Sequence, residues 1–127
     1  MGKKIIATEN AAAAVGPYNQ AVVAGGFIFV SGQLGLDPKS GALVSEEVAE
    51  QTQQAFRNLE AVLEAAGSGL QSVVKITCFI DDMNDFQSVN EQYATFFDGD
   101  YPARSCVEVS KLPKGAKVEI EAIALPA

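Results

Sequence analysis

The start of the chain alternates apolar runs with turn-forming residues in a pattern typical of a β-hairpin. Residues 18–23 and 27–31 are apolar and β-prone, and Gly25 and Gly26 between them can adopt the positive φ angles of a tight turn. We therefore expect two antiparallel strands here, with a short opening strand at residues 3–7.

Two later segments repeat apolar residues at helical spacing. The first begins at Glu46, behind a potential cap at Ser45, and stops at Gly67. The second follows Asn84, which we expect to cap it, with Gln87 in the capping-box position. The apolar positions are Val48, Ala55, Phe56, Leu59, Val62, Leu63 and Ala66 in the first segment, and Phe86, Val89, Tyr93, Phe96 and Phe97 in the second. This spacing predicts two amphipathic helices.

Three further β-prone runs, at residues 72–80, 104–110 and 117–125, complete the predicted elements. The order β-β-α-β-α-β-β fits one α/β (α+β) domain spanning residues 1–127. Two helices cannot cover both faces of a five- or six-stranded sheet, so we place both on one face. The other face mixes apolar with polar residues, namely Phe79, Ile123 and Leu125 beside Lys75, Thr77, Glu119 and Glu121. Such a face favours a subunit interface that contains polar clefts.

The alternation of side chains along the last two strands places chemically useful residues on one side. In the first of these strands Val107 and Val109 form the apolar set, so we expect Arg104 and Cys106 to face away from the helices. In the last strand the apolar residues are expected to face the helices, so Glu119, which alternates with them, points to that same open face. The pattern therefore predicts that an arginine, a thiol and a carboxylate share one face of the sheet.

The same alternation of side chains predicts that Cys78 points toward the helices. Cys78 and Cys106 would then lie on opposite sides of the sheet, and we expect no disulfide between them. Two cysteines are also too few for a disulfide framework and have no metal-type spacing.

Composition narrows the chemistry. The 127 residues include 16 Asp plus Glu against 9 Lys plus Arg, a net charge of -7, and no histidine. An acidic protein repels polyanions, so we expect no nucleic-acid partner. Because histidine is the commonest transition-metal ligand and the usual catalytic base, we expect no metal site and acid-base work by other groups. No apolar run suits a membrane span or a signal peptide, which predicts a cytoplasmic protein with no membrane partner.

Taken singly, the candidate residues have structural as well as functional interpretations. Arg104 beside a glutamate is most often a cross-strand ion pair, and Cys106 is most often a small buried apolar residue. Asn90 falls within the apolar stripe of the second helix, so its amide needs a buried partner or a polar pocket. Tyr18 can fill the core or donate to a pocket, and Ser31-Gly32 can form a turn or let a ligand approach backbone N–H groups. These residues alone support a cleft with a cationic anchor for a carboxylate.

Five segments spread over the whole chain carry distinctive motifs. They are Gly-Pro-Tyr at 16–18, Ser-Gly-Gln at 31–33, Asn-Asp-Phe at 84–86 with Val-Asn at 89–90, Pro-Ala-Arg-Ser-Cys-Val-Glu-Val at 102–109, and Glu-Ile-Glu-Ala-Ile-Ala at 119–124. Together they closely resemble the Rid family of reactive intermediate deaminases, of the RidA or YjgF type. The resemblance implies a chorismate-mutase-like fold in a homotrimer, whose sheets form a central barrel with active clefts between adjacent subunits.

The resemblance also implies an activity and a role for each matching residue. The activity is hydrolysis of reactive 2-imino acids, or their enamine tautomers, to 2-keto acids and ammonia, without a cofactor, which protects pyridoxal-phosphate enzymes from damage. Arg104 matches the arginine that binds the substrate carboxylate, and Glu119 matches the carboxylate that positions the hydrolytic water. Backbone N–H groups of Gly32 and Cys106 would hold the substrate acid or the water. Further cleft positions match Tyr18, Ser31 and Asn90.

Other functions fit the same family less specifically. A non-catalytic trimer that senses small ligands or acts like a chaperone is the main alternative. Family members that inhibit translation by cleaving RNA are a poorer match, because this chain is acidic. Chorismate mutase chemistry needs several cations around a dicarboxylate, whereas one arginine stands in the predicted cleft.

Overall fold

Six strands form one sheet in the spatial order β1-β2-β3-β6-β4-β5. The strands are β1 (Lys4–Ile6), β2 (Ala21–Ala24), β3 (Phe27–Leu34), β4 (Val73–Ile80), β5 (Ala103–Glu108) and β6 (Val118–Ala124). The computed structural model describes residues 2–127. Neighbouring strands are antiparallel except β4 and β5, which run parallel. β5 is last in the spatial order, so it is an edge strand that pairs with β4 alone.

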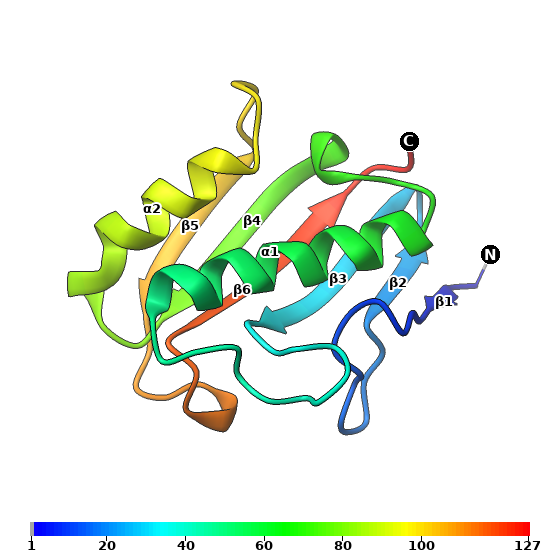
Figure 1. Cartoon of the computed structure of the whole chain (residues 1–127). Helices are drawn as coiled ribbons and strands as arrows, with labels where there is room; N and C mark the ends of the chain where they lie inside the picture. The colour runs from blue at the N-terminus through cyan, green and yellow to red at the C-terminus, as the bar shows by residue number, and fades with distance from the viewer. Residues whose placement is uncertain (1) are drawn as a thin grey trace.

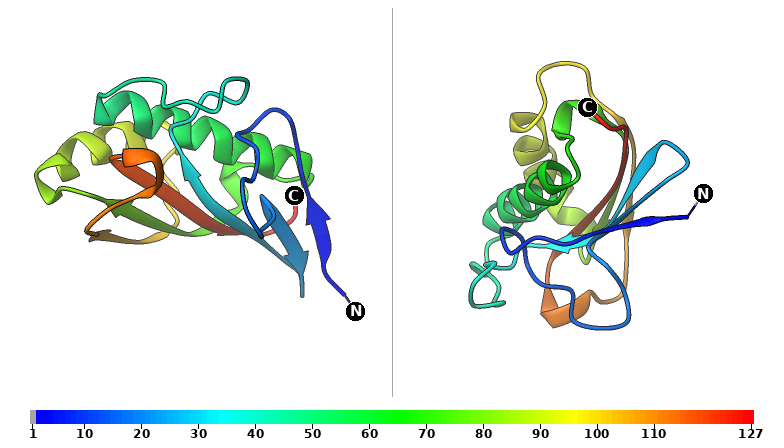
Figure 2. Two further views of the ribbon diagram at one scale, coloured as in Figure 1. Left: turned by 90° about the horizontal axis from the view of Figure 1, so that it is seen from below. Right: turned by 90° about the vertical axis from the view of Figure 1, so that its right-hand side faces the viewer.

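The helices α1 (Val48–Ala65) and α2 (Phe86–Thr95) lie on the same side of this sheet (Figures 1 and 2). α1 crosses β3 and β6, and α2 runs beside β5 at one end of the sheet (Figure 1). The predicted element order, the short opening strand and the one-sided arrangement of the helices are confirmed. Within residues 2–127, neither helix combines the length and the apolarity that a bilayer crossing requires.

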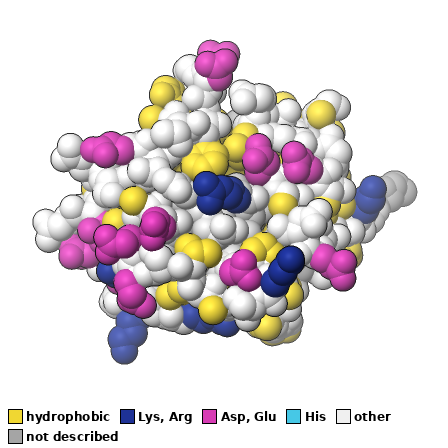
Figure 3. All heavy atoms as spheres, viewed as in Figure 1, with side chains coloured by type: hydrophobic (Ala, Val, Ile, Leu, Met, Phe, Trp, Pro, Cys, Tyr) yellow, Lys and Arg dark blue, Asp and Glu magenta, His cyan; other side chains and the backbone are white. Residues whose placement is uncertain are grey.

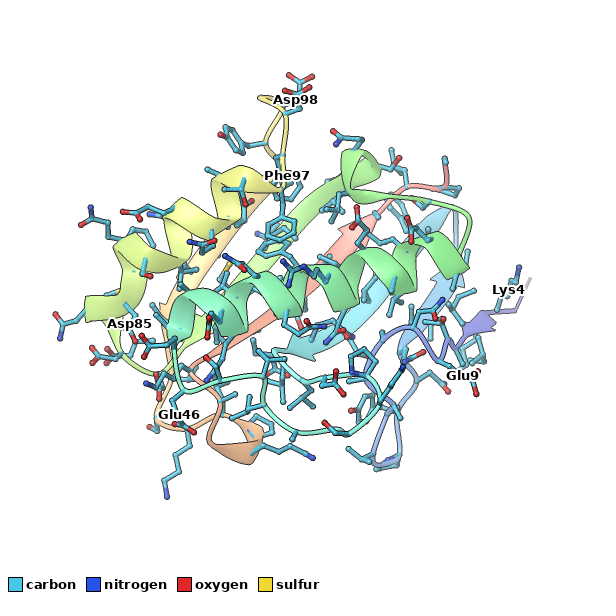
Figure 4. All side chains as sticks on the ribbon, viewed as in Figure 1. Lys4, Glu9, Glu46, Asp85, Phe97 and Asp98 are labelled. Atoms are coloured by element: carbon cyan, nitrogen blue, oxygen red, sulfur yellow. The ribbon has the colours of Figure 1, made fainter. Side chains whose placement is uncertain are left out.

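The core lies between the helices and the covered face of the sheet. Phe56 of α1 is its largest fully buried side chain. Phe97, which follows the end of α2 by two residues (Figure 4), meets it edge-on with 5.9 Å between the ring centroids. The other fully buried large apolar side chains are Ile28, Leu59, Leu63, Ile76, Ile80, Ile120, Val62, Val89 and Val118. Burial of this set on one face is the main source of stability for a chain of this size.

The helix starts differ slightly from the prediction, and the reason is local hydrogen bonding. The Ser45 hydroxyl accepts from the Glu47 N–H at 2.8 Å, but this turn precedes α1, which begins at Val48. At the second helix, Asp82 rather than Asn84 is the capping residue, because its carboxylate accepts from the Asn84 N–H at 2.9 Å. This cap starts the short 3-10 turn η2 (Met83–Asp85), which leads into α2. Gly67, with φ of +77°, follows the end of α1 as expected.

The predicted orientation of β5 is wrong. Arg104 pairs with Ile76 and Cys106 pairs with Cys78 in the parallel β4–β5 ladder. Directly paired residues on neighbouring strands point to the same face. Ile76 and Cys78 are fully buried under the helices, so Arg104 and Cys106 also face the helices. Val107 points the other way and is 43% exposed on the open face.

The error has a physical cause. An edge strand is covered by a single helix, and the inner side of α2 presents Asn90 and aromatic rings rather than aliphatic side chains alone. A guanidinium can lie against such a surface, which leaves the valines for the open face. Glu119 does point to the open face, as predicted, so Arg104 and Glu119 do not share a face within one chain. The expectation that Cys78 and Cys106 lie on opposite sides is also wrong.

Candidate active site in two halves

Arg104 is held under α2 by three side chains of that helix. Its Nη1 donates to the Asn90 Oδ1 at 2.5 Å. Its Cζ lies 4.8 Å from the centroid of the Tyr93 ring and 5.5 Å from that of Phe86. Phe86, Asn90 and Tyr93 are spaced at i, i+4 and i+7, so one face of the helix supplies all three contacts. Contacts of an exposed cation with aromatic faces contribute roughly 0.5–1 kcal/mol each, so the exposed arginine is held in one orientation.

This clamp leaves most of the guanidinium free. A guanidinium has five N–H donors, and within residues 2–127 the hydrogen bond to Asn90 is the one that Arg104 makes. Arg104 donates to an amide of α2 rather than to a glutamate of the sheet, so the cross-strand ion pair is not formed. The residues around it line a pocket open to solvent, and they are Asn90, Tyr93, Ala94, Tyr101, Pro102 and Arg104.

Tyr93 has a second feature at this pocket. It is 5% exposed, and its hydroxyl has no hydrogen-bond partner within the described residues 2–127. Burial raises the pKa of Tyr93 to about 12, against the opposing effect of the Arg104 charge. The phenol therefore stays protonated at physiological pH, and its ring serves Arg104 as a neutral apolar face.

Glu119 builds a separate half of the site on the open face of the sheet. It lies on β6 between Leu34 of β3 and Phe79 of β4. Its carboxylate sits directly against Gly32, so closely that a Cβ at Gly32 would overlap the Glu119 Oε2. A register shift between Val30 and Gln33 brings the glycine to this position.

The surroundings of Glu119 alter its acidity and form a second pocket. Burial raises the pKa of the Glu119 carboxyl, and the negative charge of Glu121 raises it further. A carboxylate with a raised pKa is a better base near neutral pH and takes up a proton more readily. The pocket is lined by Ala12, Ala13, Ala14, Val15, Tyr18, Gln20, Gly32, Gln33, Leu34, Leu36, Pro113, Lys114 and Glu119.

The predicted site residues thus fall into two groups. Tyr18 and Gly32 lie in the pocket of Glu119. Ser31 adjoins this group, but its hydroxyl donates to the carbonyl of Asn19 at 2.6 Å. Asn90 lies with Arg104, and Cys106 follows Arg104 by two residues on the same face of β5. Each half contains one of the two charged groups of the proposed chemistry.

Sequence reasoning missed two members of the Arg104 half. Phe86 and Tyr93 were predicted to be core residues, whereas both also stack on the guanidinium. The position of Asn90 between them was the available signal, because an amide inside an aromatic stripe requires a polar partner at that level. Within residues 2–127 no group of three or more Cys, Asp and Glu side chains is arranged to hold a metal ion.

Comparison with known proteins gives the family. A family model described as endoribonuclease L-PSP matches residues 8–126. A crystal structure of YyfA from Yersinia pestis, described as a member of the conserved Rid protein family, is 47% identical with a TM-score of 0.95, and the match covers 98% of this chain and 99% of that one. The chain belongs to the Rid family. The resemblance seen in the sequence motifs is confirmed.

Two other relatives of this Rid-family chain are informative. The 2-iminobutanoate/2-iminopropanoate deaminase of Mus musculus is 52% identical over 123 residues, covering 97% of this chain and 91% of that protein. A crystal structure of E. coli TdcF with bound serine is 44% identical with a TM-score of 0.93, covering 98% of this chain and 99% of that one. The likeness extends over nearly the whole length of the Rid-family chain.

Proposed function

We propose that this chain is a deaminase that hydrolyses reactive 2-imino acids, or their enamine tautomers, to 2-keto acids and ammonia. The observation that carries the proposal is Arg104, a guanidinium fixed by Asn90 and two aromatic rings, with its other donors free at a pocket. A planar cation of this kind suits bidentate recognition of a carboxylate. The mouse relative carries the name of such a deaminase, and the E. coli relative was crystallised with serine, a small molecule that bears a carboxylate.

We propose further that the active cleft forms between copies of the chain in a homotrimer. Arg104 and Glu119 lie on opposite faces of the sheet, so one chain cannot bring both to the same substrate. The open face exposes the large apolar side chains Phe27, Phe29 and Val107, as expected for a surface that another subunit covers. In the proposed cleft the Arg104 half of one subunit faces the Glu119 half of its neighbour.

The chemistry in such a cleft needs only these groups and water. Arg104 binds the carboxylate of the imino acid through two N–H donors. Glu119 accepts a proton from a water molecule, whose oxygen adds to the imine carbon, and passes that proton to the imine nitrogen to give a carbinolamine. The raised pKa of Glu119 then lets the same carboxylate take the proton of the carbinolamine hydroxyl and give it to the nitrogen, as the C=O bond forms and the C–N bond breaks. One imine and one water become one keto acid and one ammonia, without a metal or cofactor.

The remaining predicted residues shape this cleft. Backbone N–H groups of Gly32 and Cys106 hold the substrate acid or the water, and Tyr18 and Asn90 contribute hydrogen-bonding side chains at its edges, with Ser31 supporting Gly32. Orientation of a water about 3 Å from the imine carbon supplies most of the rate, because an oriented reaction within a complex avoids the entropy loss of an encounter.

The charge of the molecule supports a small substrate rather than a polyanion. The net charge is -7, and acidic side chains are spread over the helix-covered face (Figure 3). Nucleic acid is repelled by such a surface, so we do not extend RNA cleavage to this chain. Two free cysteines suit a reducing compartment, and we propose the cytoplasm.

A coupled assay tests the activity. Threonine dehydratase generates 2-iminobutanoate, semicarbazide traps it, and this protein is expected to lower the yield of semicarbazone by converting the imine first. Arg104→Ala is expected to remove the effect, while Arg57→Ala, a change at the exposed arginine of α1, leaves it intact. Binding of amino or keto acids without any change in semicarbazone would favour the ligand-sensing alternative instead.

A further inference from the structure

The two cysteines of the chain form a pair whose thiol groups the deaminase chemistry does not use. Cys78 of β4 and Cys106 of β5 are direct partners in the parallel ladder and both face α2. Both are free thiols; Cys78 is fully buried and Cys106 is partly exposed. The outer cysteine is therefore accessible to a small reagent, and the inner one lies immediately behind it.

The spacing of the pair permits a covalent bond. Neighbouring strands lie roughly 4.8 Å apart, which is inside the window of about 4.4–6.8 Å between the Cα atoms of disulfide-bonded cysteines. Each thiol also affects the pKa of the other, as expected for neighbouring sulfur atoms. We propose that Cys78 and Cys106 are a reversible oxidation site, at which hydrogen peroxide closes a disulfide that links β4 to β5 and lowers the activity of the adjacent site.

The reaction takes two steps. The Cys106 sulfur attacks one oxygen of the peroxide, the O–O bond breaks, and one water leaves with the thiol proton, so that Cys106 becomes a sulfenic acid. The Cys78 sulfur then attacks the Cys106 sulfur, the S–O bond breaks, and a second water leaves with the Cys78 proton. Two thiols are oxidised to one disulfide, and one peroxide is reduced to two waters.

The surroundings make this site slow to react. Burial raises the pKa of both thiols, to about 12 for Cys78, and the charge of Arg104 only partly opposes the effect. The pKa of the neighbouring Tyr93 phenol is raised as well, so this group stays neutral and adds no charge that would favour a thiolate. Because thiolates are the reactive form, the pair is expected to respond to sustained oxidant and to be unaffected by brief exposure.

A disulfide here would act on the candidate site through geometry. The Cβ atoms of directly paired residues on two strands lie farther apart than the roughly 3.5–4.5 Å that separates the Cβ atoms of a relaxed disulfide. Closing the bond must therefore pull β5 toward β4. Arg104 is two residues from Cys106 on the same face, and a displacement of about 1 Å at a catalytic group can cost on the order of 100-fold in rate. The strain also makes the bond easy to reduce. The effect on activity rests on the proposed function, but the disulfide itself does not.

The test uses the full chain as purified. Protein is exposed to hydrogen peroxide, blocked under denaturing conditions with a thiol reagent, and digested for mass mapping. We expect both thiols to disappear together, a peptide joining Cys78 to Cys106, and a mass loss of about 2 Da per chain, which is the signature of a disulfide. Deaminase activity should fall at least about tenfold and return after reduction with dithiothreitol.

Cys78→Val is the matched variant, because it keeps the apolar volume at a position that the proposed site does not use. It is expected to keep full basal activity and to accumulate oxidised forms of Cys106 that dithiothreitol cannot fully reverse. Should this variant fail to fold, Cys78→Ala serves the same purpose, and the mass mapping of the unmodified protein needs no variant.

Three results would overturn the proposal. They are oxidation of Cys106 to sulfinic acid without loss of the Cys78 thiol, a disulfide that joins Cys106 of two chains, and a Cys78–Cys106 disulfide that leaves activity unchanged. A protein that shows no deaminase activity before oxidation would instead contradict the proposed function, while the mapped disulfide would still decide whether the oxidation site exists.

Discussion

Asn90 accepts a hydrogen bond from Arg104 across the gap between α2 and β5. The bond links a helix residue to a residue of the edge strand, and it fixes one end of a guanidinium whose Cζ lies over the Phe86 and Tyr93 rings. α2 therefore acts as the support for the one arginine of the candidate site.

Replacing Asn90 with leucine should weaken substrate binding more than the chemical step. The variant keeps the volume of the side chain but removes the acceptor, so Arg104 loses its fixed orientation. A hydrogen bond to a charged group contributes roughly 1.5–3 kcal/mol, which predicts a rise of at least about tenfold in KM with a smaller change in kcat. Steady-state kinetics with the coupled assay measure the two constants. Equal loss in both would place Asn90 at the reacting atoms instead.

Tyr93→Phe should keep the activity and raise the stability. The substitution preserves the ring beside Arg104 and removes a buried hydroxyl that has no partner within residues 2–127. An unsatisfied buried group costs about 1–3 kcal/mol, so the midpoint of thermal unfolding should rise by a few degrees. Tyr93→Leu, which removes the ring, serves as the contrast and should lose activity. A large loss of activity in Tyr93→Phe would show that the hydroxyl contacts the substrate.

Gly32→Ala should disable the Glu119 half of the site. The new methyl group would occupy the space of the Glu119 carboxylate, which must rotate away, and we expect activity to fall by about 100-fold, as for other displaced catalytic groups. Gly69→Ala is the matched control, because a Cβ there meets nothing within 4 Å. Circular dichroism should show the same fold for both variants. An active Gly32→Ala protein would contradict the proposed role of Glu119.

The activity should decline in acid at a higher pH than an ordinary glutamate would give. The proposed base is the ionised form of Glu119, which is lost as the pH falls through its pKa. Because burial and Glu121 raise that pKa above the usual 4.5, the loss begins nearer to neutrality. A pH profile of kcat should show this acidic limb, and in Glu119→Gln both the limb and most of the activity should be absent. Glu121→Gln should shift the limb toward lower pH, because it removes a neighbouring negative charge.

Two inactive variants should restore activity when they are assembled together. In a mixed trimer of Arg104→Ala and Glu119→Gln chains, some clefts combine the intact arginine of one chain with the intact glutamate of another. Random assembly from equal amounts leaves about a quarter of the clefts intact. Unfolding and refolding the mixture, followed by the coupled assay, measures the recovery. If each chain held a complete site, the mixture would remain as inactive as its components.

The sequence predicted the elements well and the orientation of one strand badly. Helical spacing located α1 and α2, and alternation in the last strand placed Glu119 correctly on the open face. The same reasoning failed for β5, because it assumed that the valines must be the buried set. At an edge strand the partner surface decides which side is covered, and that surface is formed by residues 14 to 18 positions earlier in the chain, namely Asn90 and Phe86.

The alternation of apolar and polar residues within a strand could not show that the candidate site is divided between the two faces of the sheet. Alternation indicates which residues share a face, but not which face the helices cover when both sets contain apolar residues. Arg104 and Cys106 were correctly predicted to share a face, and both were assigned to the wrong side of the sheet. The close approach of Gly32 to Glu119 was equally hidden, because it depends on a register shift in β3 that leaves no compositional signal.

The division of the candidate site between opposite faces of the sheet has a consequence for how the protein works at low abundance. A single chain can present either the Arg104 half or the Glu119 half of the site to one imine molecule, but never both. Turnover per chain should therefore collapse on dilution below the concentration at which the copies separate, so that catalysis reports association as well as folding.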